Sequence, residues 1–167
     1  MTGDPPFTPE EVAELRKLLE IEKIRKLRQL YSQLMDGGEI DALAQIMAED
    51  AVCEFGPYGS WHGRREIHQN WTRWFKDAIP YGGLHFTTNL WIELTGPTTA
   101  ISRSYLHDVS NTPDPRANPV VWLGIYDEDY EKLDGRWLIK VCRLQFLWPK
   151  RITGEDFPRP MTATTLG

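Results

Sequence analysis

The sequence predicts an α+β domain in which one long helix and two shorter helices pack on one face of a curved antiparallel sheet. In the first part of the 167-residue chain, up to Asp77, apolar residues recur mainly at helical spacing. After Gly82-Gly83 the apolar pattern changes to alternation, and strand-like segments follow one another up to Leu147. Helices followed by a run of strands is the order typical of a two-layer domain of this class.

The first helix has the clearest boundaries. Thr8 can cap its start, and Glu11 stands where the acid of a capping box belongs. An apolar stripe at helical spacing then continues until it stops at Gly37-Gly38. We expect two shorter helices and five strands after it, the helices at 41–47 and 64–77 and the strands at 51–55, 85–94, 99–109, 120–130 and 136–147.

The composition is that of one ordinary globular domain. Apolar residues make up 41% of the chain and charged residues 26%, both close to the averages for soluble proteins. We place the domain at 1–148. The tail at 149–167 is rich in proline and small polar residues, which predicts irregular structure and makes it a candidate lid over a binding pocket.

Several classes of partner are disfavoured. The net charge is −5 and the two signs are interleaved, which argues against nucleic acid as a partner. No apolar run reaches the roughly 18 residues of a membrane span, and the N-terminus lacks a signal-peptide pattern, so we expect no membrane partner and a cytoplasmic location. Cys53 and Cys142 are too few for a disulfide framework or a zinc site. We expect neither a metal nor another cofactor.

The order of short motifs over residues 20–148 resembles SnoaL-like domains of the nuclear-transport-factor-2-like (NTF2-like) superfamily. The branch it is most similar to holds scytalone dehydratase, bile-acid dehydratase and lindane dehydrochlorinase. The resemblance implies a cone-shaped fold in which a bent sheet wraps around the long helix and leaves a deep apolar pocket. It implies the reaction much less, because this fold hosts many activities. The matching segments are 30–31, 35–37, 46–52, 63–67, 85–89, 126–131 and 134–137.

The resemblance also implies catalytic residues. His85 stands at the family's histidine strand, and an imidazole can take up and return a proton near neutral pH. Asp36 matches the acid that pairs with this histidine, and a carboxylate on one ring nitrogen would set the tautomer. Its alternative role is a helix-terminal turn residue. Tyr31 matches the family's hydrogen-bond donor to substrate oxygen, although it could equally be a core aromatic. Five residues separate it from Asp36, about 140° around a helix.

Asp108 matches an acidic pocket residue of the bile-acid enzyme, but the sequence leaves open which face of its strand lines the pocket. Alternation from His85 places Asn89 and Trp91 on the same face as the histidine. Phe146 stands where the bile-acid enzyme carries a pocket arginine, which favours an uncharged, aromatic ligand. We therefore expect the substrate to contact Asn89, Phe55, Trp71, Trp91, Trp122 and Phe146.

These residues predict a cofactor-independent lyase that removes a proton and eliminates water from an apolar, aromatic small molecule. One variant of this reaction would also release a one-carbon fragment. Two alternatives stay open: an isomerase similar to ketosteroid isomerase, and a non-catalytic ligand-binding protein or small subunit of a ring-hydroxylating dioxygenase. The strand at 120–130 is apolar on both faces, which predicts a homo-oligomer, either a trimer or a dimer.

Overall fold

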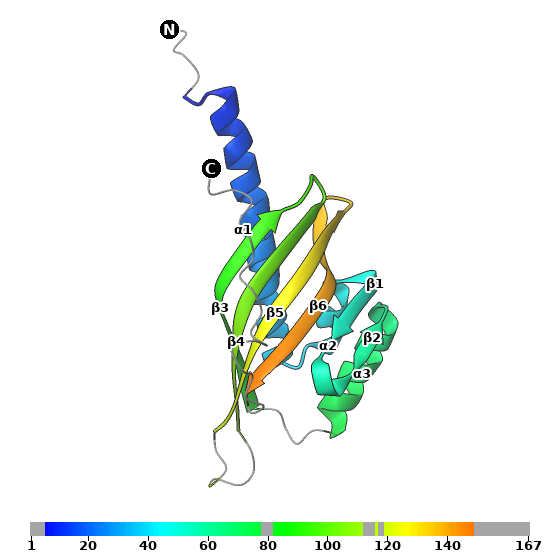
Figure 1. The fold of residues 1–167 in the computed structure, drawn as a ribbon. Helices are drawn as coiled ribbons and strands as arrows, with labels where there is room; N and C mark the ends of the chain where they lie inside the picture. The colour runs from blue at the N-terminus through cyan, green and yellow to red at the C-terminus, as the bar shows by residue number, and fades with distance from the viewer. Residues whose placement is uncertain (1–5, 78–81, 112–115, 117–118, 149–167) are drawn as a thin grey trace.

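The fold is a layer of helices on one face of a six-stranded sheet, as Figure 1 shows. The computed structural model describes residues 6–77, 82–111, 116 and 119–148. The candidate lid at 149–167 lies outside these residues. In chain order the elements are α1 (Pro9–Asp36), α2 (Ile40–Gln45), β1 (Met47–Glu54), a 3-10 turn (Gly56–Tyr58), β2 (Ser60–His62), α3 (Arg64–Asp77), β3 (Gly82–Leu94), β4 (Thr99–Asn111), β5 (Val120–Leu133) and β6 (Arg136–Trp148).

The sheet has the strand order β2-β1-β6-β5-β4-β3. Hairpin connections make β3 to β6 an antiparallel run, as the sequence predicts. The prediction of a wholly antiparallel sheet is wrong at one pair, because β1 runs parallel to β6, with Cys53 opposite Cys142. These two strands lie far apart in the chain, so no tight turn sets their relative direction. The sheet is therefore mixed.

Helix α1 begins at the predicted cap. The Thr8 side chain accepts a hydrogen bond from the Glu11 backbone at 3.2 Å, and the Glu11 carboxylate accepts one from the Thr8 backbone at 2.8 Å. Its first turns extend beyond the strands (Figure 1), and its buried side chains begin at Ile24. The helix ends at Asp36, before Gly38 takes a φ of 68° that glycine adopts without strain.

The elements around α3 differ in detail from the sequence prediction. Helix α2 ends at Gln45, and Met47, expected in that helix, begins β1 instead. The short strand β2 was not predicted, because three residues leave too short a pattern of alternation. Helix α3 packs on α2, β1 and β2, at the edge of the sheet opposite β3. Among the described helices, none has an apolar stretch sufficient to cross a membrane.

Candidate functional site

A cavity of about 490 Å³ lies between the helices and the sheet. Its wall is mostly aromatic and carries a small number of polar side chains, the composition typical of a small-molecule site. The sequence-predicted residues that line it are Tyr31, Phe55, Trp71, His85, Asp108, Trp122 and Phe146.

The His85 ring is joined to the end of α1 by Asp36. Its Nδ1 atom lies 2.6 Å from Asp36 Oδ1. The His85 backbone N–H also donates to the same carboxylate, at 3.1 Å from each oxygen. The two side chains are 8% and 20% exposed, so water competes little for this contact. The backbone and the ring of His85 thus both contact the Asp36 carboxylate. These contacts fix the position of the ring and of the strand that carries it.

This contact decides the tautomer of neutral His85. A carboxylate on Nδ1 requires a proton there, so the lone pair of the neutral ring lies on Nε2. The same nitrogen lies 3.9 Å from Asp108 Oδ2. Asp108 in turn accepts a hydrogen bond from the Ser110 hydroxyl at 3.2 Å. The ring therefore presents its basic nitrogen on the side of Asp108, a residue that also lines the cavity.

The structure settles which face of β4 lines the cavity. Asp108 and Leu106 belong to the lining, and Ser104 is fully buried on the same side of the strand. Tyr105 and His107 lie on the opposite face, because side chains alternate along a strand. The sequence left this choice open, since both faces of the strand carry polar and apolar residues.

Tyr31 lies in the wall of the cavity at 1% exposure. Its ring makes edge contacts with Trp71 and Tyr126, each with ring centres 6.1 Å apart. Burial raises the pKa of the Tyr31 phenol well above its ordinary value. The hydroxyl consequently remains protonated at neutral pH and can donate a hydrogen bond. Tyr31 is thus at once a packed aromatic residue and part of the cavity wall.

Two residues predicted to contact substrate, Asn89 and Trp91, do not belong to the described lining of this cavity. The expected alternation from His85 fails because the pairing of β3 with β4 shifts between Thr88 and Trp91. Asn89 adopts a φ of 52° at this irregularity. Trp91 then pairs with Arg103 on the outer face and is 44% exposed. The prediction that Trp91 shares the face of His85 is therefore wrong, and Asn89 lies at the irregularity itself.

Sequence analysis missed Tyr58, which ends the 3-10 turn and lies in the cavity wall. Its ring contacts Trp74 and Phe146, with centres 5.4 and 5.7 Å away. Burial and the negative charge of Asp108 both raise the pKa of Tyr58. The glycines on either side of Tyr58 indicate only an interruption of secondary structure. One aromatic residue within this turn is the only feature of the sequence that points to Tyr58. A second phenol is therefore placed near Asp108.

A buried charged layer adjoins the cavity. The Arg28 guanidinium lies over the rings of Tyr31 and Tyr126, at 4.3 and 4.0 Å from their centres. Its Nη1 atom is 3.5 Å from Glu128 Oε1, and neither side chain is exposed. Glu128 also accepts a hydrogen bond from Tyr130 at 2.6 Å. Arg28 therefore packs against two rings of the cavity wall and ties α1 to β5.

The chain matches the family model of the SnoaL-like domain over residues 16–143. Its fold is also similar to those of several solved proteins. A candidate scytalone dehydratase from Novosphingobium aromaticivorans DSM 12444 superposes with a TM-score of 0.71, at 23% identity, over 78% of this chain and 85% of that chain. A protein of unknown function from Mycobacterium tuberculosis gives a TM-score of 0.73, at 22% identity, over 91% of this chain and 82% of that chain.

A hexachlorocyclohexane dehydrochlorinase, LinA type 2, superposes with a TM-score of 0.70, at 19% identity, over 88% of this chain and 98% of that chain. Identities this low show a shared fold, and the family match covers most of the chain. The cone-shaped α+β fold that the sequence predicts is thereby confirmed. The chain belongs to the SnoaL-like domain family.

Proposed function

We propose that the chain is a lyase that eliminates water from an apolar, aromatic small molecule held in the cavity. The observation that carries this proposal is the His85–Asp36 contact of 2.6 Å next to an aromatic cavity. A base held by a carboxylate, with its basic nitrogen on the cavity side, is the arrangement that proton abstraction from carbon needs. Relatives by fold include proteins described as a scytalone dehydratase candidate and as a dehydrochlorinase, which supports an elimination.

The elimination divides into two proton movements. His85 Nε2 takes the proton from a C–H bond, and the electron pair of that bond forms the new carbon–carbon double bond. The hydroxyl on the neighbouring carbon leaves, and it departs as water once it has accepted the proton from the imidazolium. Asp36 stabilises the imidazolium between these movements. Tyr31, kept protonated by burial, donates a hydrogen bond to a substrate oxygen.

The experiment is a screen of aromatic β-hydroxy ketones in deuterated water, followed by mass spectrometry. The wild type is expected to release a product lighter by one water, and recovered substrate is expected to carry deuterium next to the carbonyl. His85→Ala should abolish both signals. Equal turnover by His85→Ala and wild type on a substrate that the wild type dehydrates would refute the mechanism.

A second candidate is an isomerase that uses a carboxylate as base. The observation that favours it is Asp108, which lines the cavity near the phenol of Tyr58. An isomerase returns the proton to another carbon, so the product keeps the mass of the substrate. It also predicts that Asp108→Asn reduces turnover far more than His85→Ala. The lyase predicts the reverse order, so the two variants and the product mass together distinguish the candidates.

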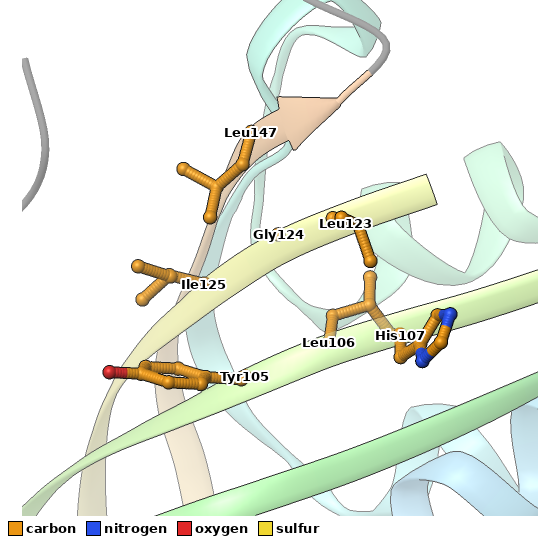
Figure 2. Close-up of a pocket in the computed structure, with 7 residues that line it drawn as sticks. All are labelled: Tyr105, Leu106, His107, Leu123, Gly124, Ile125 and Leu147. Carbon is orange, nitrogen blue, oxygen red and sulfur yellow. The ribbon is translucent and has the colours of Figure 1, made fainter. Parts of the chain in front are cut away.

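We also propose that copies of the chain associate through the outer face of the sheet. Figure 2 shows an apolar depression there, formed by neighbouring strands around Gly124. The charged side chains beside it are paired within the chain, as Arg103 is with Asp127 at 2.6 Å. An apolar patch whose neighbouring charges are already paired within the chain can pack against the same patch of a second copy. Its large exposed side chains are Leu84, Phe86, Trp91, Tyr105 and Leu123.

A further inference from the structure

One helix brings a cation to the cavity. Arg73 of α3 lies in the cavity wall with its neighbours Asn70 and Trp74. Residues three and four apart lie side by side on a helix surface, so the guanidinium and the Asn70 amide occupy one stripe. Among the lining residues that the structure describes, Arg73 is the one lysine or arginine.

The surroundings of Arg73 differ from those of the arginines that are paired within the chain. Arg28, Arg103 and Arg143 each form an ion pair with a carboxylate. For Arg73, no ion pair or hydrogen bond is found with any residue in the described ranges. Its side chain is exposed. The guanidinium is therefore a set of hydrogen-bond donors at the rim of an apolar cavity, available to a ligand.

The charged groups of the cavity come from different elements. His85 and Asp108 belong to β3 and β4, at one edge, whereas α3 packs on β1 and β2 at the other edge. Figure 1 shows α3 on the side of the sheet away from β3. Aromatic rings, among them Trp71 and Trp122, form the wall of the same cavity. A ligand that fills it thus meets a base carried by β3 and a cation carried by α3.

We propose that the substrate carries a carboxylate, which Arg73 and Asn70 bind on the α3 side while the reacting carbon faces His85. A guanidinium presents a planar fork of N–H donors that matches a carboxylate, and the Asn70 amide adds a donor. This inference rests on the proposed function and changes its substrate class from an apolar aromatic molecule to an aromatic carboxylic acid. The expectation of an uncharged ligand was based on Phe146 in the last strand and did not include Arg73 of α3.

The test uses two probes of nearly the same shape, naphthalene-2-carboxylate and its methyl ester. Binding to the full chain is measured by tryptophan fluorescence and by calorimetry. Arg73→Gln is expected to weaken carboxylate binding about tenfold, the order for a charged hydrogen bond at a partly exposed site, and to leave ester binding within about twofold. Raising the salt concentration should weaken carboxylate binding to the wild type and leave ester binding unchanged.

The matched control is Arg65→Gln, which removes an exposed arginine of the same helix that does not belong to the described lining. It should alter the affinity for neither probe. If Arg73→Gln changes both affinities equally, or changes neither, the carboxylate inference is overturned while the aromatic cavity of the proposed lyase stands. If the wild type binds neither probe, the cavity fails as an aromatic site, and the proposed function and this inference fall together.

Discussion

At the scale of single residues, the contact between Asp36 and His85 connects the end of a helix to an edge strand. The carboxylate accepts hydrogen bonds from both the ring and the backbone of His85. It therefore orients the ring and also stabilises a positive charge on it. An asparagine in its place retains the size of the side chain but can donate to Nδ1, which favours the wrong tautomer.

We therefore predict that Asp36→Asn lowers kcat by about 10²–10⁴-fold on a substrate that the wild type dehydrates. KM should change less, because the carboxylate contacts the base and not the ligand. The melting temperature serves as the control for folding. A variant that retains wild-type kcat would leave Asp36 only its alternative role, that of a helix-terminal turn residue.

Tyr31 tests whether a residue in the cavity wall acts through its ring or through its hydroxyl. Tyr31→Phe retains the ring contacts with Trp71 and Tyr126 and removes one donor. We expect stability close to that of the wild type and a decrease in kcat of about 10²-fold, as for the loss of one donor to a developing charge. Unchanged kinetics would show that Tyr31 is a packing residue.

At the scale of elements, α1 is held to the sheet by contacts from Glu20 onward. Near its middle, the Glu20 carboxylate accepts hydrogen bonds from Lys132 and from the Trp137 indole, both at 2.7 Å. The hydrogen bonds from Lys132 and Lys23, with that from Trp137, outweigh burial and lower the pKa of Glu20 to about 2. Since the folded pKa lies below the ordinary 4.5, its stabilisation is complete above pH 4.5 and is lost as the pH falls towards 2.

The corresponding prediction concerns the pH dependence of stability. Glu20→Gln should lower the melting temperature at pH 6, by about 2–4 °C for each kcal/mol lost in a chain of this size. The difference from the wild type should shrink between pH 4.5 and 2. Glu14→Gln is the control, because Glu14 is exposed and contacts only Lys17 among the described residues. A difference that stays constant with pH would contradict the assigned pKa.

Further along α1, Arg28 and Glu128 form a buried pair, and each charge depends on the other. Removing one partner leaves an unpaired charge inside the protein. Arg28→Met should therefore lower the free energy of unfolding by about 3–5 kcal/mol, measured by urea denaturation. The double variant Arg28→Met, Glu128→Gln should recover part of this loss. If the double variant loses more free energy of unfolding than the two single variants lose together, the pair does not act through charge.

At the scale of the whole molecule, the proposed association of copies through the outer face of the sheet can be tested. We expect the wild type to be an oligomer by size-exclusion chromatography with light scattering, and Leu123→Glu to dissociate it, because a charge would be buried in the contact. Leu18→Glu is the control, since Leu18 is 59% exposed and lies on α1, away from the sheet. A monomeric wild type at micromolar concentrations would contradict the proposed contact.

Local chemistry explains why much of the fold could be predicted from the sequence. A capping box, an apolar stripe that ends at paired glycines, and alternation after Gly83 each act over a few residues. The motifs that resemble the family also singled out His85 and Asp36, and the structure brings these two together. By contrast, the sequence prediction places Trp91 on the wrong face, because an irregularity in strand pairing leaves no mark on the alternation pattern.

The sequence by itself determined the helices and the antiparallel run from β3 to β6, because these follow from spacing along the chain, and its resemblance to the family indicated the pair of His85 and Asp36. Only the tertiary structure decided that β1 runs parallel to β6, that Asp108 faces inward, and that Tyr58 and Arg73 reach the cavity. These depend on how distant segments pack. Packing depends on how whole surfaces fit together, so it cannot be predicted from the pattern within one segment.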